Sequence, residues 1–524
     1  MRNAKYLTWR FFFIMCVGVA VVSCRKNEDH LAPMQMFSPG SFSITSGSES
    51  VWLTWDPSLY MSSTDTTVTY TVEVSTDSTF QGDPLLTATT DTTGIRFTDD
   101  TLAARQQYFA RVKANATGAR PESRWVLSPS FKIIGIQLML AKQIEVQPTS
   151  VLLKWQITPG VTSVVLSKKG TGGQTDTSRS VITDQELATG AKEVDGLSVS
   201  TSYHVELYKG KKSVGYADFT TRPAINMDGV VDLSDIQGRP EVLEDTLPAV
   251  AAGSTILLRR GYTYTLSSGY AVDKSLTIMS KPGFEPDAMI WLQGGTALDF
   301  ADGSQVDSLR FDQVSLYGDY DNNYVLNVSK STTVSKIIFN ECTIRNFRGI
   351  FRIKASKPVD ITTVTYNNCL IDSINSYGVL DVDNAAATVH QANFTNSTIS
   401  NCQIVLVSKS ASDAVTFQSS TIYNSPVKGK YLIDYNSNDV GVVTIQSCIL
   451  GAANAVKGYR VGSASTLKVL GTYSTSDYNV SGNQIPGVTL YNQGSDEVFT
   501  DAAAGNFTVQ DPNFPAVGDP RWLN

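Results

Sequence analysis

The chain has 524 residues, a net charge of −7 and only three histidines. This length exceeds one ordinary domain, and without a basic excess the chain lacks the electrostatics needed to bind nucleic-acid phosphates. Charged residues make up only 17 % of the sequence. Short runs rich in Thr, Ser and Val recur along the chain without a helical period, and this pattern predicts an all-β protein.

The N-terminus has the layout of a secretory signal. Arg2, Lys5 and Arg10 precede an apolar run over residues 11–22, which is short for a membrane-spanning helix. The run ends at Val-Val-Ser-Cys24, which resembles the lipobox of bacterial lipoproteins. The resemblance implies that Cys24 is lipidated and becomes the mature N-terminus, whereas ordinary cleavage nearby is the alternative.

The residues around this cysteine suggest where the protein goes. We predict a signal peptide over residues 1–23 and a tether over residues 24–35. Residue 25 is Arg rather than the Asp of an inner-membrane retention signal, and the polar stretch 25–30 resembles the tethers of surface-exported lipoproteins. The predicted location is the outer membrane, lipid-anchored and facing the extracellular side.

Two β-sandwiches are expected next, over residues 36–135 and 136–222. Short alternating strands in both segments are separated by Ser, Thr, Asp and Gly turns. Each segment has a tryptophan, Trp55 or Trp155, and each has a leucine six residues before a tyrosine: Leu102 and Tyr108, then Leu197 and Tyr203. This spacing resembles the tyrosine corner of fibronectin type III modules, which implies two tandem modules that hold the next domain away from the membrane.

Residues 223–524 carry a short repeat that predicts a right-handed parallel β-helix. Blocks such as Phe339-Asn-Glu-Cys-Thr-Ile344 begin at residues 339, 366, 394, 417 and 445, and strands recurring at this period stack as coils. The repeat column that holds Cys342, Cys369 and Cys448 holds serine in the other blocks, so we expect buried free thiols. An amphipathic segment at residues 239–248 is expected to cap the open end of the stack.

Two stretches of this domain resemble known families. Residues 255–283, with a strand, Gly-Tyr-Thr-Tyr, a second strand and Lys-Pro-Gly, resemble the first coils of pectate-lyase-like proteins. Residues 499–522 are similar to the closing segment of uncharacterised β-helix domains in surface lipoproteins encoded beside glycan-uptake systems of Gram-negative bacteria. The resemblance implies a glycan-importer complex as a possible partner and leaves the activity open.

The second strands of the coils align into outward-facing columns. Because side chains alternate along a strand, the second and fourth residues of each tetrapeptide face solvent, and coils climb about 4.8 Å each. One column reads Arg352, Asp381, Val407, Asp434, Arg460, and its neighbour reads Lys354, Asp383, Lys409, Asn436, Gly462. We expect Arg352 beside Asp381 and Lys354 beside Asp383. Asp381, Asp383, Asp434 and Arg460 are the candidate polysaccharide ligands.

These columns also suggest chemistry that pectate lyases use. Asp381, Asp383 and Asp434 are candidate calcium ligands, and Arg352, Lys354 and Lys409 are candidate bases. The alternative is that alternating charges only neutralise the stack.

Other candidate residues lie outside these columns. Tyr320 and Tyr324, in an acidic stretch after Gly318, are further sugar-binding candidates, although a solvated loop is the alternative. His390 is interpreted as a turn residue. Asn346, Asn401 and Asn424 are interpreted as structural residues of the coil corners.

Taken together, these patterns favour binding of an extended polysaccharide at the cell surface. A long rigid face with spaced polar and aromatic side chains suits an extended carbohydrate chain. The alternatives are a calcium-dependent polysaccharide lyase that acts by β-elimination, and a structural or adhesive surface protein.

Overall fold

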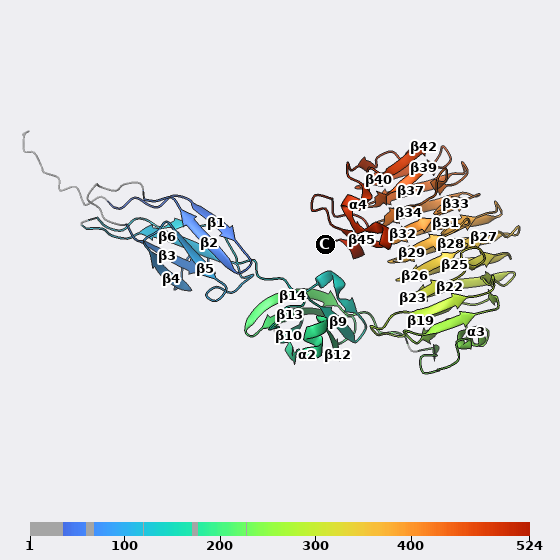
Figure 1. Ribbon diagram of the computed structural model, residues 1–524, viewed down its shortest axis with the longest axis horizontal. Coiled ribbons are helices and arrows are strands. Elements are labelled where there is room, and N and C mark those ends of the chain that lie inside the picture. The colour runs from blue at the N-terminus through green and yellow to red at the C-terminus, as the bar shows by residue number, and fades with distance from the viewer. Residues whose placement is uncertain (1–34, 59–67, 119, 170–176, 227, 524) are drawn as a thin grey trace, which may run out of the picture.

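The computed structural model describes residues 35–58, 68–118, 120–169, 177–226 and 228–523. Two β-sandwiches in a row lead to a large stack of coils, as Figure 1 shows. The all-β prediction is confirmed. The predicted signal peptide and Cys24 lie outside the described residues.

The first sandwich is built from two antiparallel sheets. One sheet has the order β1 (Phe42–Ser46), β2 (Ser50–Trp55) and β5 (Gly94–Thr98). The other has the order β4 (Leu86–Thr90), β3 (Tyr70–Ser75), β6 (Phe109–Ala114) and β7 (Val126–Leu127). Trp55 is buried between them, and the Tyr108 hydroxyl donates to the Ala103 carbonyl at 3.4 Å. A three-stranded sheet packed on a four-stranded one, closed by a tyrosine corner, is the arrangement of a fibronectin type III module.

The second sandwich repeats this strand order. Its sheets are β12 (Ala191–Asp195), β9 (Ser150–Lys154) and β8 (Glu145–Val146), and β11 (Thr177–Val181), β10 (Ser163–Lys168), β13 (Ser202–Lys209) and β14 (Lys212–Thr220). Trp155 is buried, and the Tyr203 hydroxyl accepts from the Ser198 amide at 2.9 Å. Helix α2 (Asp184–Thr189) precedes β12 and is held by a capping box between Thr183 and Glu186. Both modules are therefore fibronectin III-like.

The rest of the chain forms a parallel β-helix with three sheets. The first sheet contains β15 (Val230–Asp232), β16 (Ser254–Leu258), β19 (Leu276–Ser280), β22 (Ser304–Asp312), β25 (Thr332–Asn340), β28 (Val359–Asn367), β31 (Ala387–Thr395), β34 (Ser412–Gln418), β37 (Val440–Gln446) and β40 (Thr466–Leu470). The second contains β17 (Thr263–Leu266), β20 (Ala288–Leu292), β23 (Val314–Tyr317), β26 (Thr343–Phe347), β29 (Leu370–Ile374), β32 (Thr398–Cys402), β35 (Thr421–Tyr423), β38 (Ile449–Gly451), β41 (Tyr473–Ser474) and β43 (Thr489–Leu490). The third contains β18 (Tyr270–Val272), β21 (Leu298–Phe300), β24 (Tyr324–Val328), β27 (Gly349–Ile353), β30 (Leu380–Val382), β33 (Leu406–Ser408), β36 (Tyr431–Asp434), β39 (Ala453–Arg460) and β42 (Tyr478–Gly482).

The sequence repeat marks the corner between the first and second sheets. Its first residue is inside the coil, where Phe311, Phe339, Tyr366, Phe394 and Phe417 stack with centroids 4.5–5.3 Å apart and planes within 5–8°. Its third residue has a left-handed backbone that turns the chain, as in Glu341, Asn368, Asn396, Ser419 and Ser447. Its fourth residue points inward, and the prediction of buried free thiols in this column is confirmed.

A short helix covers the first coils of the β-helix, and the C-terminal segment packs on its side. Helix α3 (Val242–Thr246) buries Val242 and Leu243 against the first coils, which confirms the predicted cap. The C-terminal elements α4 (Ser495–Val498), β44 (Phe499–Asp501) and β45 (Asn506–Val509) form a separate apolar cluster on the outer side of the second sheet, where they pack against Tyr423, Ile449 and Tyr473. The last residues return to the second sheet, where the Thr398 hydroxyl donates to Asp519 at 2.8 Å and accepts from the Trp522 indole at 2.7 Å. In the described ranges no helix is long and apolar enough to cross a membrane.

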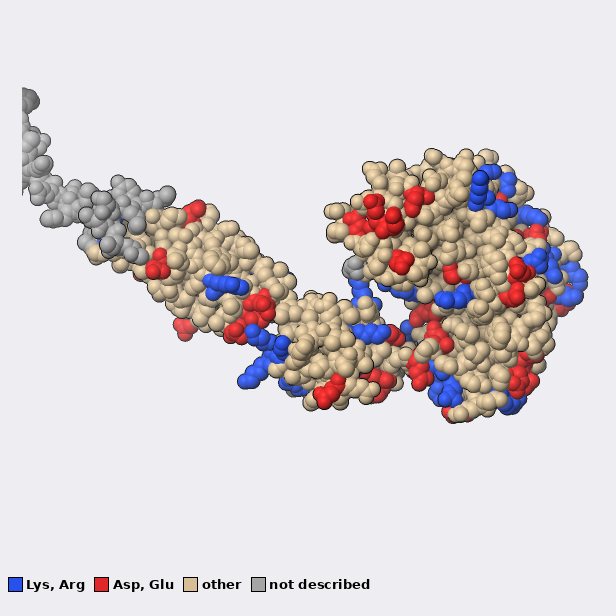
Figure 2. Space-filling model, viewed as in Figure 1, with Lys and Arg blue, Asp and Glu red and all other residues tan. Residues whose placement is uncertain are grey.

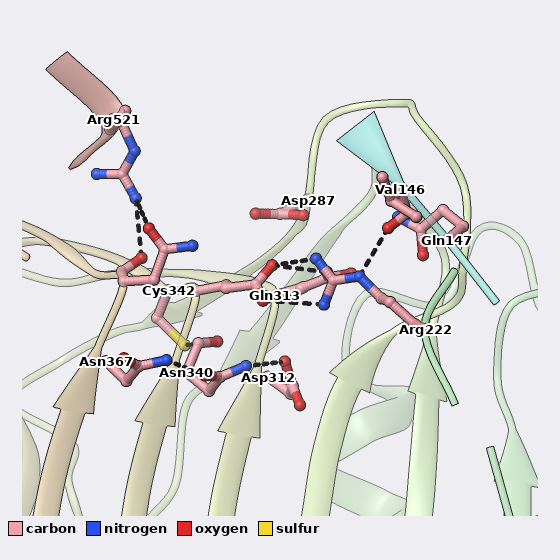
Figure 3. A network of polar contacts seen from close by, with 12 residues as sticks. Val146, Gln147, Arg222, Asp287, Asp312, Gln313, Asn340, Cys342, Asn367 and Arg521 are labelled. Atoms are coloured by element: carbon pink, nitrogen blue, oxygen red, sulfur yellow. Dashed lines mark hydrogen bonds and ion pairs between the residues drawn. The ribbon is translucent and has the colours of Figure 1, made fainter. Parts of the chain in front are cut away.

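A polar network joins the second sandwich to the β-helix (Figure 3). The Arg222 guanidinium donates to both carboxylate oxygens of Glu341, at 2.9 and 2.6 Å, and to the Val146 carbonyl at 2.7 Å. Gln313 donates to the same carboxylate at 2.9 Å, and Gln147 donates to the Gly283 carbonyl at 2.9 Å. The Arg222–Glu341 pair is two-pronged and partly buried, so it defines the orientation between the two domains.

Candidate functional site

The outward column predicted on the second strands of the coils is present with the expected register, but it lies on the third sheet, because each of these coils has three strands. Arg352 pairs with Asp381, Asp381 with Val407, Val407 with Asp434, and Asp434 with Arg460 on strands β27, β30, β33, β36 and β39. Figure 2 shows basic and acidic side chains interspersed along the side of the β-helix where Figure 1 labels β27 and β33. The column is therefore a mixed-charge face.

The ion pairs on this face differ from those expected. Arg352 contacts Asp383 at 2.5 Å rather than Asp381, and Lys409 contacts the other oxygen of Asp383 at 2.6 Å. The Arg352 side chain is long enough to reach diagonally to Asp383, two residues beyond its register partner Asp381. Asp383 therefore forms ion pairs with two cations, Arg352 and Lys409. Lys354 is exposed and makes no ion pair in the part of the chain that the structure describes.

Asp381 is the unusual residue of the face. Its side chain is 6 % exposed, and within the described ranges no hydrogen bond reaches its carboxyl. Burial, helped by the charge of Asp383, raises the pKa of Asp381 to about 7, although Arg352 and Lys409 oppose the shift. A carboxyl with this pKa can take up or release a proton near neutral pH.

Three buried polar atoms around Arg352 have no hydrogen-bond partner among the described residues. They are the Tyr324 hydroxyl, the Asn327 side-chain oxygen and Arg352 Nε. Asn327 pairs with Arg352 in register, so these atoms belong to adjacent coils. Buried polar atoms usually find partners, because an unmade hydrogen bond costs about 1–3 kcal/mol. Their concentration beside Asp381 distinguishes this place from the rest of the face.

A turn supplies the aromatic part of the site. Tyr377 lies under the Arg352 guanidinium at 3.8 Å and under that of Arg348 at 5.0 Å. Its ring is 5.6 Å from the Tyr324 ring. We call these residues together the Arg352 cluster: Tyr324, Asn327, Arg348, Arg352, Tyr377, Asp381, Asp383 and Lys409.

Sequence reasoning missed three members of the cluster. Tyr377 and Arg348 lie in turns, outside the aligned strands, and Asn327 lies on β24, one coil before the first strand of the aligned column. The register of the column extends to Asn327, so alignment of one more coil would have found it. No strand pattern indicates the two turn residues.

A second cation–aromatic group lies farther along the same face. Arg460 makes a two-pronged ion pair with Asp434 at 2.7 and 2.8 Å and lies over the Tyr431 ring at 4.8 Å. Lys457 lies over the same ring at 5.0 Å. Asp434 is two rungs from Asp381, or about 10 Å. The face thus presents two similar groups in a row.

The two predicted tyrosine ligands are not equivalent. Tyr324 is 4 % exposed and faces the Arg352 cluster, whereas the Tyr320 hydroxyl accepts from Gln403 at 3.1 Å. The loop between them is held by its own contacts, because Asn375 donates to the Tyr320 carbonyl at 3.0 Å and to Asp321 at 3.1 Å. The solvated-loop alternative describes Tyr320 better, since its polar groups already have partners.

The calcium site predicted from Asp381, Asp383 and Asp434 is not assembled. Asp383 is held by Arg352 and Lys409, and Asp434 is held by Arg460. Over the described ranges no group of three or more His, Cys, Asp or Glu side chains could hold a metal ion. The carboxylates lie on different rungs and already have cationic partners, so the expectation of a shared ion is corrected.

Arg352 is also unsuited to the role of a base. Burial lowers the pKa of Arg352, but the hydrogen bond to Asp383 and the neighbouring negative charge outweigh this effect and raise it. A guanidinium stabilised in its charged form does not accept a proton at neutral pH. Asp381 replaces it as the proton-transfer group that the geometry supports.

His390 is not a turn residue. It lies in β31, where its two ring nitrogens contact Asp413 at 3.0 Å and Asp360 at 3.1 Å. The two carboxylates come from the coils on either side and are distant in sequence, so the local pattern around His390 gave no sign of them. The corner asparagines are confirmed as structural: Asn346, Asn401 and Asn424 have left-handed backbones, and Asn424 donates to Asn401 at 2.8 Å.

Comparisons with known proteins cover both parts of the chain. Two family models match the β-helix, each described as a domain of unknown function: DUF4957 over residues 262–402 and DUF5123 over residues 415–522. No curated protein matches the chain. Similar solved structures include the FN1-FN3 domains of chicken CNTN1, at 15 % identity, covering 36 % of this chain and 66 % of that chain with a TM-score of 0.16.

Two further chicken structures have similar scores. A two-domain fibronectin type III segment of tenascin is 13 % identical and covers 35 % of this chain and 99 % of that chain, with a TM-score of 0.19. The interferon gamma receptor alpha chain is 15 % identical and covers 35 % of this chain and 98 % of that chain, with a TM-score of 0.17. The assignment of the modules above therefore depends on strand order and not on these similarities.

Proposed function

We propose that this protein is a lipid-anchored, outward-facing outer-membrane protein that binds polysaccharide through the third sheet of its β-helix. The observation that carries the proposal is the Arg352 cluster, where charged side chains, the Tyr377 ring and buried polar groups without hydrogen-bond partners among the described residues lie together. The two sandwiches would hold this face away from the membrane, and a glycan-importer complex is a possible partner.

Carbohydrate is the ligand class that fits these groups best. A sugar hydroxyl both donates and accepts hydrogen bonds, so it can accept from the exposed Lys354 and Lys409 ammonium groups and donate to the partly exposed Asp383 carboxylate. Tyr377 and Tyr431 are amphipathic rings that offer an apolar surface beside these polar groups. Their placement along one face suits a chain of repeating units rather than a single small molecule.

Binding can be tested by glycan array followed by calorimetric titration of the full chain. Tyr377→Ala is expected to weaken binding of the best glycan by about tenfold or more, as for an aromatic anchor. Tyr377→Phe, which keeps the ring, should bind nearly as the native protein does. Lys330→Ala removes an exposed cation beyond β24 and is the matched surface control. An array without any hit would instead favour the adhesive or structural role.

A second candidate, a polysaccharide lyase, is favoured by Asp381. In β-elimination a base removes the proton beside a uronate carboxylate, the glycosidic C–O bond breaks, and the leaving oxygen takes up a proton. Asp381 has a pKa suited to such transfer, raised by burial to about 7. Release of ultraviolet-absorbing unsaturated uronate, lost in Asp381→Asn while binding persists, would establish the lyase. Binding without any product would exclude it.

A further inference from the structure

The second sheet of the β-helix carries a line of outward-facing side chains that the Arg352 cluster does not include. Trp291 on β20 pairs in register with Tyr317 on β23, which pairs with Arg345 on β26. Their sequence neighbours Ile290, Leu316 and Ile344 point into the core and are buried. The three side chains therefore project outward on successive rungs, about 4.8 Å apart.

Trp291, the first residue of the line, is exposed to solvent. Trp291 is 41 % exposed, and across the described ranges no ring contact or hydrogen bond engages its indole. The Tyr317 hydroxyl is oriented by Asn346, which donates to it at 3.2 Å. An exposed Trp291 beside a half-buried Tyr317 is typical of a binding surface, because rigid aromatic rings lose little entropy on contact.

Arg345 adds a positive charge to the end of the line. Its side chain is exposed, and no carboxylate lies within ion-pair distance of it in the described part of the chain. Asp372, the next residue of the column, is engaged instead by Ser400 at 2.9 Å and Asn401 at 2.8 Å. A guanidinium left free in this way suits a planar carboxylate, with which it forms paired hydrogen bonds.

The surroundings leave room for an extended ligand. A cleft of about 690 Å³ opens on the same sheet, two residues along β26 at Thr343. Its other walls come from the second sandwich, through Glu145 and Arg222, and from the C-terminal segment, through Arg521. The cleft therefore lies beside the Arg345 end of the line, because Thr343 and Arg345 are two residues apart on the same strand.

We propose that Trp291, Tyr317 and Arg345 form a second carbohydrate subsite that takes an acidic oligosaccharide. Pyranose rings lie on the two aromatic faces, and a uronate carboxylate is bound by Arg345. This subsite shares its ligand class with the proposed function but none of its residues. It lies on the second sheet, whereas the Arg352 cluster lies on the third.

The test is calorimetric titration of the full chain with uronic-acid oligomers of galacturonate, glucuronate and alginate type, and with neutral galactose oligomers. Trp291→Ala is expected to weaken binding of an acidic oligomer by about tenfold. Arg345→Ala should bring the affinities for acidic and neutral oligomers close together. Met289→Ala removes a 37 % exposed side chain from the same strand and is the matched control, expected to bind as the native protein does.

Trp291 fluorescence gives a readout at the site itself. The acidic oligomer should change the emission of the native protein and of Tyr377→Ala, but the change should be absent in Trp291→Phe. Binding that survives Trp291→Ala and Arg345→Ala, or a native protein that binds none of the acidic oligomers, would overturn the subsite. Binding lost in Tyr377→Ala but kept in Trp291→Ala would retain the proposed function and reject only this subsite.

Discussion

Asp381 and Asp383 lie two residues apart on one coil, and their surroundings push their pKa values in opposite directions. Burial raises the pKa of Asp381 to about 7. Burial also opposes ionisation of Asp383, but hydrogen bonds from Lys409 and Arg352 outweigh it and lower the pKa of that carboxyl. One aspartate is thus held ready to change its protonation state, while the other is kept ionised and anchors two cations.

The raised pKa of Asp381 predicts a pH dependence of stability. The folded state holds a proton that the unfolded state releases, so stability falls as pH rises from about 4 to about 7. Asp381→Asn should remove this fall and stabilise the β-helix at pH 8 by about 2–4 kcal/mol. Thermal unfolding of the native protein and the variant at a series of pH values measures both effects. An unchanged pH profile in the variant would contradict the assignment.

Asp383→Asn should change the pH dependence of stability in the opposite direction to Asp381→Asn. Because the folded-state pKa of Asp383 is lowered, its contribution is present above its unfolded pKa and is lost as pH falls. The amide leaves Arg352 and Lys409 without their carboxylate. The variant should therefore be less stable at neutral pH, and its difference from the native protein should shrink in acid.

At the scale of elements, the coils from Phe311 to Phe417 share a corner in which three features coincide. An aromatic ring fills the interior, a left-handed residue turns the chain, and a small side chain follows inside the corner. Asn and Ser tolerate or approach the left-handed region more easily than branched residues, which explains their recurrence at the third position. The sequence repeat therefore reflects the requirements of one corner, which recurs in successive coils.

Phe394→Ala tests the interior stack. The ring is fully buried and lies 5.3 Å from Tyr366 and 4.5 Å from Phe417, so its loss leaves a cavity between two coils. We expect the free energy of unfolding of the β-helix to fall by about 3–5 kcal/mol. Gln391→Ala, at an exposed position of the same strand, should change it by less than about 0.5 kcal/mol. Chemical denaturation followed by circular dichroism compares the two variants.

At the scale of the whole molecule, the second sandwich and the β-helix are joined by side chains rather than by a bare linker. Arg222 binds Glu341, and Lys142 donates to the Leu523 carbonyl at 2.9 Å, so the sandwich meets both an early coil and the chain's last residues. The two sandwiches are joined similarly, since Arg105 donates to Ser213 at 2.8 Å and lies over the Tyr216 ring at 4.6 Å. These contacts favour a stiff arm over a flexible string of domains.

Arg222→Ala should loosen the arm without unfolding either domain. The variant removes three hydrogen bonds at the junction, two of them to the Glu341 carboxylate, and keeps the hydrogen bond from Gln313 to that carboxylate. Small-angle X-ray scattering is expected to show a larger radius of gyration and a broader distance distribution. Arg239→Ala, whose ion pairs lie within the N-terminal cap, should leave the scattering unchanged. Identical profiles for both variants would show that the junction is stiff for another reason.

The predicted anchor is tested in cells. Cys24→Ser removes the thiol that the lipobox resemblance assigns to lipidation, so the variant should lose incorporation of labelled fatty acid and leave the outer-membrane fraction. Cys16→Ser, within the predicted signal peptide, is the control and should retain both. Membrane association that persists in Cys24→Ser would reject the lipid anchor.

The sequence by itself determined the all-β class, the stacked coils and the register of the outward columns, because strand alternation and the corner repeat are local properties of the chain. It did not determine which charges would meet. Arg352 forms its ion pair with Asp383 and not with its register partner Asp381. Tyr377 contacts Arg352 from a turn, and the two carboxylates that contact His390 belong to neighbouring coils. Side-chain reach, burial and contacts between distant coils decided these features, and such quantities exist only once the chain is folded.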